Sequence, residues 1–386
     1  MKWLGERTRP ARAGAAVSSV LVVAGTRPES IKLAPLVWAL ADRRSRSTIV
    51  VNSGQHPHAV RETFAEFGVA CDVELGALPA MPNLLASFDH LRTEMRAVVA
   101  RFRPRCVVVQ GDTLTAYAAA VAGRDAGFPV AHVEAGLRTQ SATDPFPEEW
   151  FRRRIAHVAD FHFAPTRAAA AHLQAEGISA EAIHHTGNTG IDSLRWMLDR
   201  LDADCGPAQP DRRHVLITLH RRENYDCNTE IVCRALLRLA NALPELSMIF
   251  PVHPSPRVAE PIRRRLGSHR SFELIGPMAY GDFIRAAAEA ALIISDSGGI
   301  QEEAPHLGTP LIVPRCNTER PEAIATGFVQ LVEVDEHAIV AAACSALAAP
   351  RKTPLAIDER APFGAGDAAM RIVKILEPII VERAYA

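Results

Sequence analysis

Three acidic residues in the first half of the sequence could carry proton-transfer chemistry. Asp112 directly follows the β-branched run Cys106–Gln110, and Glu134 directly follows Val130–Val133. Glu148 stands a little further along the chain. Each alone fits a helix cap or a solvent-facing acid better than a catalyst. Because parallel strands end at one edge of a sheet, three acids there could share a site, where crowding shifts their pKa values apart and provides both an acid and a base.

A glycine-containing turn in the second half could bind a diphosphate. The apolar run Leu292–Ser295 leads into Asp296-Ser297-Gly298-Gly299 and then a helix-like stretch. Small residues at a strand-to-helix turn leave backbone N–H groups open, and the helix N-terminus attracts anions. Glu303, one turn further on, could accept hydrogen bonds from ribose hydroxyls. A capped helix after a tight turn explains the segment equally well.

Basic residues follow other predicted strands. Arg27 and Lys32 come after Val20–Val23, where an arginine could hold a phosphate with two hydrogen bonds; a surface salt bridge is the alternative. In the second half, the residues that follow strands include His220, Arg221 and His253. A lone histidine is usually structural, so His220, beside paired arginines, is a better candidate than His253.

The elements that position these residues alternate between short apolar strands and alanine-rich or amphipathic helices. This pattern is typical of parallel sheets covered on both faces. The first series of strands is expected at Val20–Val23, Thr48–Asn52, Cys106–Gln110, Val130–Val133 and Phe161–Ala164. After Gly206-Pro207 a second series is expected at Val215–Thr218, Ser247–Pro251, Phe272–Ile275, Leu292–Ser295, Leu311–Val313 and Phe328–Leu331.

Two successive α/β series predict two doubly wound domains that face each other across a cleft. The join is expected around Ile191–Asp211. Residues 1–12 are basic and 13–24 apolar, which imitates a secretory signal. Cleavage near Ala24 would remove the first strand, so a loose arm over residues 1–17 is the favoured interpretation.

Composition excludes several classes of protein. The 386 residues include 43 Lys and Arg and 44 Asp and Glu, so the formal charge of −1 argues against nucleic acid as a partner. No apolar run is long enough to span a membrane. Seven cysteines without a Cys-x-x-Cys pair indicate core thiols and a reducing, cytoplasmic location. Neither a P-loop nor a Gly-x-Gly-x-x-Gly motif after a strand occurs, and no metal site is expected.

In combination, the motifs resemble the non-hydrolysing, bacterial UDP-N-acetylglucosamine 2-epimerase family. They follow the family's order over nearly the whole chain from Val20 onward, and the ordered set is highly specific although each motif is weak. The matching segments are Gly25–Lys32, Gly54-Gln55-His56, Gly111-Asp112-Thr113, His132–Thr139, Pro147-Glu148-Glu149 with Arg152, Phe163–Thr166, Gly187-Asn188-Thr189, His220–Asn224, Pro251-Val252-His253, Ser295–Glu303, Thr318–Glu322 and Gly364–Asp367.

This resemblance implies two Rossmann-like domains of GT-B architecture. It places an N-terminal domain at residues 18–195, a UDP-binding domain at 205–365, and a C-terminal helix at 366–386 that returns to the first domain. The implied reaction inverts C2 of the sugar in UDP-N-acetylglucosamine through 2-acetamidoglucal and UDP. Neither a nicotinamide nor a metal is required, and a cytoplasmic homodimer is implied.

Residue roles also come from the resemblance. The implied catalytic residues are Asp112, Glu134, Glu148 and His220, and the implied substrate-binding residues are Arg27, Lys32, Ser297, Gly298, Gly299, Glu303 and Arg320. Many members bind a second, activating UDP-sugar, and the residues that match that second site are Gln55, His56, Arg221 and His253. The departures from the family pattern are His58, Asn83, Phe151 and Arg153, which leads us to expect weak or absent activation.

Three alternatives remain open at this stage. A hydrolysing epimerase would release free N-acetylmannosamine and UDP. A GT-B glycosyltransferase would use the same diphosphate site, although the carboxylates and Gly25–Lys32 disfavour it. A non-catalytic nucleotide-sugar sensor is disfavoured by the intact set Asp112, Glu134, Glu148 and His220.

Overall fold

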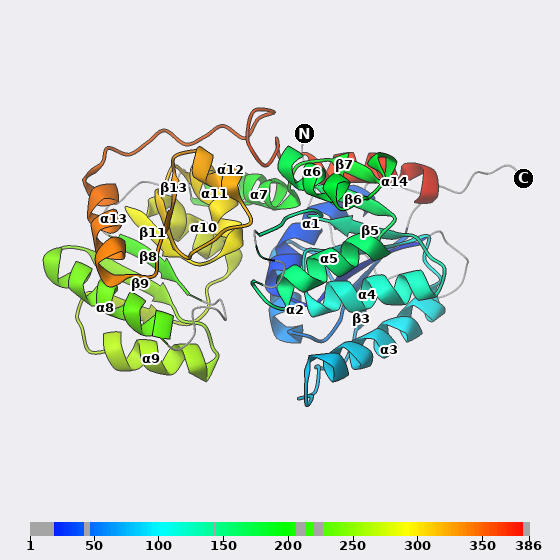
Figure 1. Ribbon diagram of the computed structural model, residues 1–386, viewed down its shortest axis with the longest axis horizontal. Helices are drawn as coiled ribbons and strands as arrows, with labels where there is room; N and C mark the ends of the chain where they lie inside the picture. The colour runs from blue at the N-terminus through cyan, green and yellow to red at the C-terminus, as the bar shows by residue number, and fades with distance from the viewer. Residues whose placement is uncertain are drawn as a thin grey trace, which may run out of the picture. The chain divides into compact units, whose positions relative to one another are not determined.

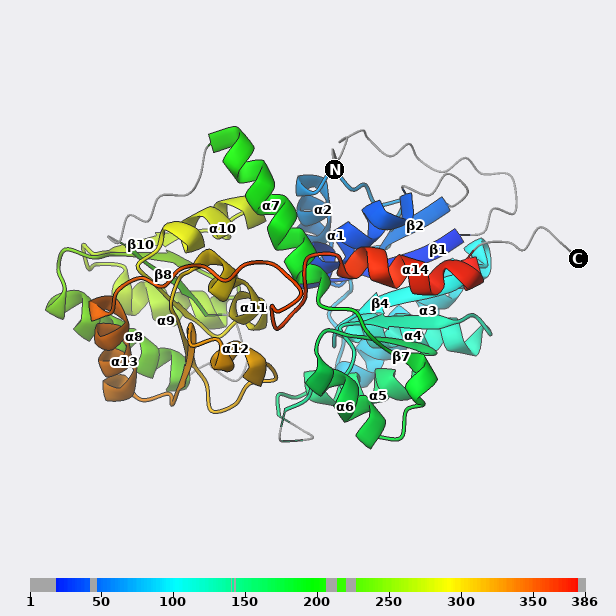
Figure 2. The same ribbon diagram turned by 90° about the horizontal axis from the view of Figure 1, so that it is seen from above.

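The chain folds into two α/β units. The computed structural model describes residues 19–41, 47–139, 141, 144–205, 214–219 and 227–380, and two views are given in Figures 1 and 2. Unit 1 comprises Met1–Ser193 and Asp358–Ala386, and unit 2 comprises Leu194–Ile357. The predicted N-terminal arm lies outside the described residues, as do His220 and Arg221.

The described part of unit 1 contains a seven-stranded parallel sheet in the order β3-β2-β1-β4-β5-β6-β7. The order reverses between β1 and β4, which is the position where open α/β sheets bind ligands. The strands are β1 (Ser19–Ala24), β2 (Ser47–Asn52), β3 (Val73–Glu74), β4 (Cys106–Gln110), β5 (Val130–Val133), β6 (Phe161–Ala164) and β7 (Ile183–His185).

Helices cover both faces of this sheet. One face packs on α3, α4 and α5 through a core that includes Leu21, Val107 and Met95, and α14 packs on α1 (Figure 2). The helices are α1 (Arg27–Ala41), α2 (Pro57–Glu66), α3 (Leu84–Phe102), α4 (Leu114–Asp125), α5 (Glu148–Val158), α6 (Arg167–Ala175), α7 (Thr189–Cys205), which continues into unit 2, and α14 (Ala368–Ile380).

The described part of unit 2 repeats this topology with six parallel strands in the order β10-β9-β8-β11-β12-β13, reversing between β8 and β11. The strands are β8 (His214–Thr218), β9 (Ser247–Pro251), β10 (Phe272–Ile275), β11 (Leu292–Ser295), β12 (Leu311–Pro314) and β13 (Val329–Val332). The helices are α8 (Cys227–Ala242), α9 (Pro256–Leu266), α10 (Tyr280–Glu289), α11 (Gly298–Leu307), α12 (Pro321–Ala325) and α13 (Glu336–Ala348). Helices α8, α9 and α13 share one hydrophobic core (Figure 1).

The predicted α/β class with two Rossmann-like sheets is therefore confirmed, and every predicted strand is present to within a residue or so at each end. Strands β3 and β7, which have only two and three residues, were not predicted. In β7 the ring of His184 lies 5.7 Å from that of Phe163, so this half-buried histidine is part of the packing. No helix within the described ranges is long and apolar enough to cross a membrane.

Candidate active site

The loop after β1 is shaped by one glycine and one buried acid. A Cβ on Gly25 would lie 2.0 Å from Thr115 Oγ1, so only glycine fits. Glu29 is fully buried, and its carboxylate accepts hydrogen bonds from Gly25 N (3.0 Å), Thr26 Oγ1 (2.8 Å) and Thr113 Oγ1 (2.7 Å). Glu29 thus ties the turn after β1 to the residue that caps α4. Arg27, half-buried, is the first residue of α1.

Asp112 lies in the turn after β4, where a buried arginine holds it. Arg152 Nη2 pairs with Asp112 Oδ2, and the arginine side chain is 5% exposed against 26% for the aspartate. The preceding carbonyl, of Gly111, accepts a 2.8 Å hydrogen bond from Nε2 of His132. Burial lowers the pKa of His132 to about 3, so the imidazole is neutral and acts as a fixed donor. The carboxylate of Asp112 is therefore oriented while part of it stays open to solvent.

Glu134 follows β5 in an unusual backbone conformation. Its φ of +65° is in the left-handed region, which costs a non-glycine residue on the order of 1–3 kcal/mol, and such residues cluster at active sites and ligand-binding turns. Lys32 Nζ donates to Glu134 Oε2, as does Asn188 Nδ2 at 3.0 Å. Lys32 is buried where it makes this ion pair. Asn188 was not predicted as a site residue, although it lies in the matching segment Gly187-Asn188-Thr189.

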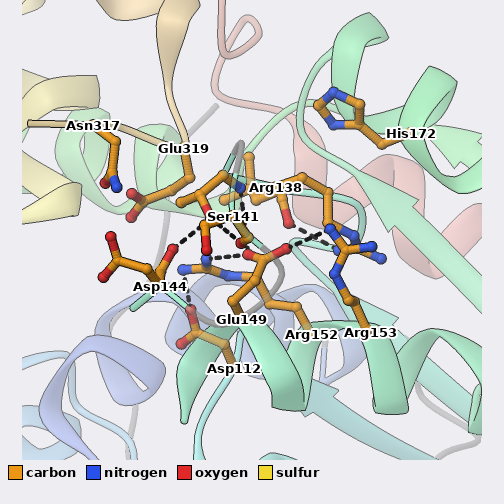
Figure 3. Close-up of polar contacts among 12 residues, drawn as sticks. Asp112, Arg138, Ser141, Asp144, Glu149, Arg152, Arg153, His172, Asn317 and Glu319 are labelled. Carbon is orange, nitrogen blue, oxygen red and sulfur yellow. Dashed lines mark hydrogen bonds and ion pairs between the residues drawn. The ribbon is translucent and has the colours of Figure 1, made fainter. Parts of the chain in front are cut away.

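Glu148 and Glu149 open α5 but have different environments. Glu148 is half-buried, whereas Glu149 is fully buried and accepts from Arg152 Nη1 at 2.9 Å and from Thr139 N at 3.3 Å. Figure 3 shows Glu149 between Arg152 and Arg153. The structure thus joins the Asp112 turn to the helix that begins with Glu148, and places Glu134 in a separate contact set on the neighbouring strand.

In unit 2 the turn after β11 leads directly into α11. Ser295 Oγ bonds to Thr218 Oγ1 (2.6 Å) and accepts from Ser297 N (3.0 Å), which orders the turn. Ser297 is the N-cap residue and makes no side-chain cap bond. A Cβ on Gly299 would meet no atom within 4 Å, so the unit itself does not require glycine there. A glycine that packing does not demand fits a backbone that a ligand approaches closely.

Two further predicted substrate residues of unit 2, Glu303 and Arg320, are buried, and the predicted second-site residue His253 is half-buried. Tyr280 donates a 2.7 Å hydrogen bond to Glu303. The guanidinium of Arg320 pairs with Glu302 and Glu319. His253 Nδ1 accepts from Ser255 N at 3.1 Å. Among the described residues, no three His, Cys, Asp or Glu side chains are grouped as a metal ion would need.

The amino-acid sequence matches a known protein family. The family model described as UDP-N-acetylglucosamine 2-epimerase matches residues 39–377. The chain belongs to the UDP-N-acetylglucosamine 2-epimerase family. It is 37% identical over 368 residues to the UDP-N-acetylglucosamine 2-epimerase of Escherichia coli K12, covering 93% of this chain and 98% of that protein. The protein of that name from Salmonella typhimurium is 38% identical over the same shares of both chains.

Solved structures of this epimerase family share the fold. The Neisseria meningitidis UDP-GlcNAc 2-epimerase, solved bound to UDP-GlcNAc, has a TM-score of 0.86 and 34% identity, covering 93% of this chain and 100% of that one. The Methanocaldococcus jannaschii enzyme, solved with UDP-GlcNAc and UDP, has a TM-score of 0.82 and 31% identity, covering 93% and 99%. The resemblance inferred from the motifs, its GT-B class of fold and its enzyme class, an isomerase, are confirmed.

Three departures from the epimerase pattern have structural explanations. Phe151 packs in the core of unit 1, 5.6 Å from the ring of Tyr117. Arg153 donates to Glu176 at 2.9 Å and lies 3.2 Å from Glu149. Asn83 caps α3 by accepting from Ala86 N at 2.9 Å.

The residues that the epimerase resemblance assigns to a second site lie partly beside α4. Gln55 Oε1 accepts from Thr115 N at 3.2 Å and from Thr115 Oγ1 at 2.8 Å. His56 is the exposed N-cap residue of α2, and the departing residue His58 is also exposed on that helix. The binding of a second UDP-sugar by these residues stays a prediction.

Proposed function

We propose that this chain interconverts UDP-N-acetylglucosamine and UDP-N-acetylmannosamine by inverting C2 of the sugar. The observation that carries this proposal is the pair Asp112 and Glu134. They follow adjacent strands beside the reversal point of the unit 1 sheet, and each is oriented by a buried cation, Arg152 or Lys32, in a member of this epimerase family. Such carboxylates suit proton transfer at a carbon that must lose and regain hydrogen.

The first half of the reaction is an elimination. The C2 proton is not acidic, so the C1–O bond to UDP loosens first and gives the ring oxocarbenium character. A carboxylate then takes the C2 proton, the C2–H electron pair forms the C1=C2 double bond, and the C1–O pair departs with UDP. We assign the proton transfers at the two faces of the ring to carboxylates of the set Asp112, Glu134 and Glu148.

The second half reverses these steps with the opposite configuration at C2. A protonated carboxyl delivers its proton to C2 of the 2-acetamidoglucal from the other face, and a diphosphate oxygen bonds again to C1. The UDP leaves and returns as an anion, which needs nearby donors throughout. We assign this task to Arg27, to the N-terminus of α11 at Ser297-Gly298-Gly299, and to His220; we assign substrate contacts to Lys32, Glu303 and Arg320.

Incubation with UDP-N-acetylglucosamine in D2O, followed by proton NMR, tests the proposal. We expect deuterium at C2 and the appearance of the UDP-linked epimer. Free N-acetylmannosamine with an equal amount of UDP would instead identify the hydrolysing reaction. No deuterium at C2 would contradict both epimerase mechanisms.

We also propose that turnover requires no activating second UDP-sugar. The support is local: Arg153 is committed to Glu149 and Glu176, and Asn83 to the cap of α3, so two of the departing residues are used within the fold. We expect a hyperbolic dependence of rate on UDP-N-acetylmannosamine concentration. Sigmoidal kinetics that trace UDP-N-acetylglucosamine abolishes would contradict this.

We also propose that the protein is a homodimer located in the cytoplasm. Five of the seven cysteines, Cys71, Cys106, Cys233, Cys316 and Cys344, are free thiols, which fits a reducing compartment. The dimer rests on family resemblance alone. Light scattering coupled to gel filtration measures it directly, with twice the mass of one chain expected.

A further inference from the structure

A chain of ion pairs, in which acidic and basic side chains alternate, begins at Asp112 and extends through unit 1. Three carboxylates and three arginines follow one another in the order Asp112, Arg152, Glu149, Arg153, Glu176, Arg138, as Figure 3 shows in part. The mechanism above uses Asp112 from this set and leaves Glu149 and Arg153 without a task. Their formal charges cancel, and Glu149, Arg152 and Arg138 are the buried members of the set.

Glu149 is the central member of this charge chain. It is 0% exposed, and its two oxygens face different arginines: Oε2 accepts from Arg152 Nη1 at 2.9 Å, and Oε1 lies 3.2 Å from Arg153 Nη2. The two arginines stand three and four residues further along α5, which places them on the same side of the helix as Glu149. A buried carboxylate without such partners would be strongly destabilising.

The outer end of the chain anchors it to the rest of unit 1. Arg138 binds both oxygens of Glu176, at 2.8 Å from Nε and 2.6 Å from Nη2, and Arg153 adds a third donor at 2.9 Å. Burial alone would raise the pKa of Glu176, but Arg138 and then Arg153 outweigh it and hold the pKa below its ordinary value. Glu176 is therefore a fixed anion just after α6.

We propose that Glu149 and Arg153 are positioning residues for the reaction, which act on Asp112 through Arg152. Glu149 fixes the side chain of Arg152, and Arg152 in turn fixes the Asp112 carboxylate; Arg153 balances the second oxygen of Glu149. The same helix, α5, begins with Glu148. The series of ion pairs therefore links Asp112 to the helix that carries a second proposed catalytic carboxylate. This inference rests on the proposed epimerase function for its rate effects, but not for its geometry.

Kinetics of Glu149→Gln, Glu149→Asp and Arg153→Gln test the proposal, with Arg154→Gln as the matched control. Arg154 is the next residue of α5 and is exposed, with its guanidinium over the Trp150 ring, outside the charge chain. We expect Glu149→Gln to lower kcat about 10²-fold with KM little changed, because displacing a reacting group by about 1 Å costs that much. Arg153→Gln should lose on the order of tenfold, and Arg154→Gln less than about twofold.

Two further results separate positioning from a merely structural role. Glu149→Asp, which keeps the charge, should recover part of the kcat that Glu149→Gln loses. In the double variant, Arg153→Gln should add no loss to that of Glu149→Gln, because both act through one network. Additive losses, or wild-type kcat in folded Glu149→Gln, would overturn the proposal. If Glu149→Gln does not fold, Arg153→Gln decides the question.

A readout independent of activity keeps this inference apart from the proposed function. In protein labelled with 13C-aspartate, the carboxyl resonance of Asp112 is assigned by its loss in Asp112→Asn. We expect it to shift in Glu149→Gln and Arg153→Gln, and to stay in place in Arg154→Gln. An unmoved resonance contradicts positioning; a wild-type protein that fails the D2O experiment contradicts the function alone.

Discussion

At the scale of single residues, the strongest sign of function is the pair of carboxylates, each fixed by a buried cation. A cation that pairs with a carboxylate fixes its orientation, and stereochemical inversion needs proton-transfer groups in fixed positions at the two faces of the ring. Lys32 pairs with Glu134, whose backbone is left-handed, and Arg152 pairs with Asp112, which follows a glycine. In unit 1 both of these cations pair with acids, and the substrate contact that the resemblance implies for Lys32 stays a prediction.

We predict that Asp112→Asn and Glu134→Gln lose about 10²–10⁴-fold in kcat, the usual loss when proton transfer is removed, while UDP affinity stays within a few-fold. Glu74→Gln is the matched control, because Glu74 also pairs with an arginine, Arg61, but at the exposed edge of the sheet. The D2O exchange assay and UDP titration by calorimetry measure both quantities. An equal loss of kcat in all three variants would contradict a role in proton transfer for Asp112 and Glu134.

Glu29 predicts a pH dependence of stability. Burial raises the pKa of its carboxyl from 4.5 to about 7, although hydrogen bonds from Thr113, Thr26 and Gly25 oppose the shift. Between these pH values the folded state binds more protons than the unfolded state, so the free energy of unfolding falls as the pH rises from about 4.5 to about 7. At about 1.4 kcal/mol per pKa unit, the ionised Glu29 destabilises the fold by roughly 3 kcal/mol above that range.

Glu29→Gln resembles the protonated acid in shape and charge. We therefore expect the variant to be more stable than the wild type at about pH 8 and to have a shallower fall in stability below about pH 7. Some slope should remain, because burial also raises the pKa of Asp192 to about 7. Urea unfolding across this pH range measures the effect, and identical slopes for the two proteins would contradict it.

At the scale of elements, the start of α11 joins a tight turn to a helix dipole. The strand β11 ends, the turn through Asp296 and Ser297 is ordered by Ser295 Oγ, and the helix begins at Gly298. Its first turn presents backbone N–H groups and a partial positive charge to an anion. Backbone groups alone would form the diphosphate site proposed here, and the segment lacks the lysine that defines a P-loop motif.

We predict that Gly299→Ala weakens UDP binding at least about tenfold without lowering the thermal unfolding temperature. The new methyl group meets no protein atom, and alanine favours the helix by up to about 1 kcal/mol over glycine, so any loss of affinity comes from the ligand side. Gly276→Ala is the control, since a Cβ there also meets nothing. Unchanged UDP affinity in Gly299→Ala would exclude close contact at this turn.

At the scale of the whole molecule, unit 1 is built from both ends of the sequence. Helix α14 packs on α1, with Ile372, Val373 and Leu376 fully buried. Its N-terminal N–H groups, of Ala368 and Ala369, donate to Asp192 at 3.2 and 2.9 Å. The last helix is therefore part of the core that supports the β1–α1 loop.

A negative charge introduced into α14 should affect stability very differently at two neighbouring positions. We predict that Val373→Asp destabilises unit 1 by about 3 kcal/mol or more, because it buries an unpaired charge. Lys374→Asp should change stability by less than about 0.5 kcal/mol, because Lys374 is exposed. Thermal unfolding followed by circular dichroism compares them. A Val373→Asp protein as stable as the wild type would mean that α14 is dispensable.

The sequence by itself determined the fold class, most strands and the positions of Asp112 and Glu134. Strand periodicity and the residues at strand ends are local properties, so buried parallel strands such as Cys106–Gln110 and Val130–Val133 were predicted with the bounds that the structure has. The short strands β3 and β7 were missed, because two or three residues are too few to show a period.

Only the tertiary structure decided which charges meet. Nothing in the spacing of Lys32 and Glu134, or of Arg152 and Asp112, shows that these residues pair across the fold. Such contacts join segments that are far apart in the sequence, and only the fold shows that Glu149 is fully buried between Arg152 and Arg153. Partner choice depends on packing in three dimensions, and that information is absent from a linear pattern.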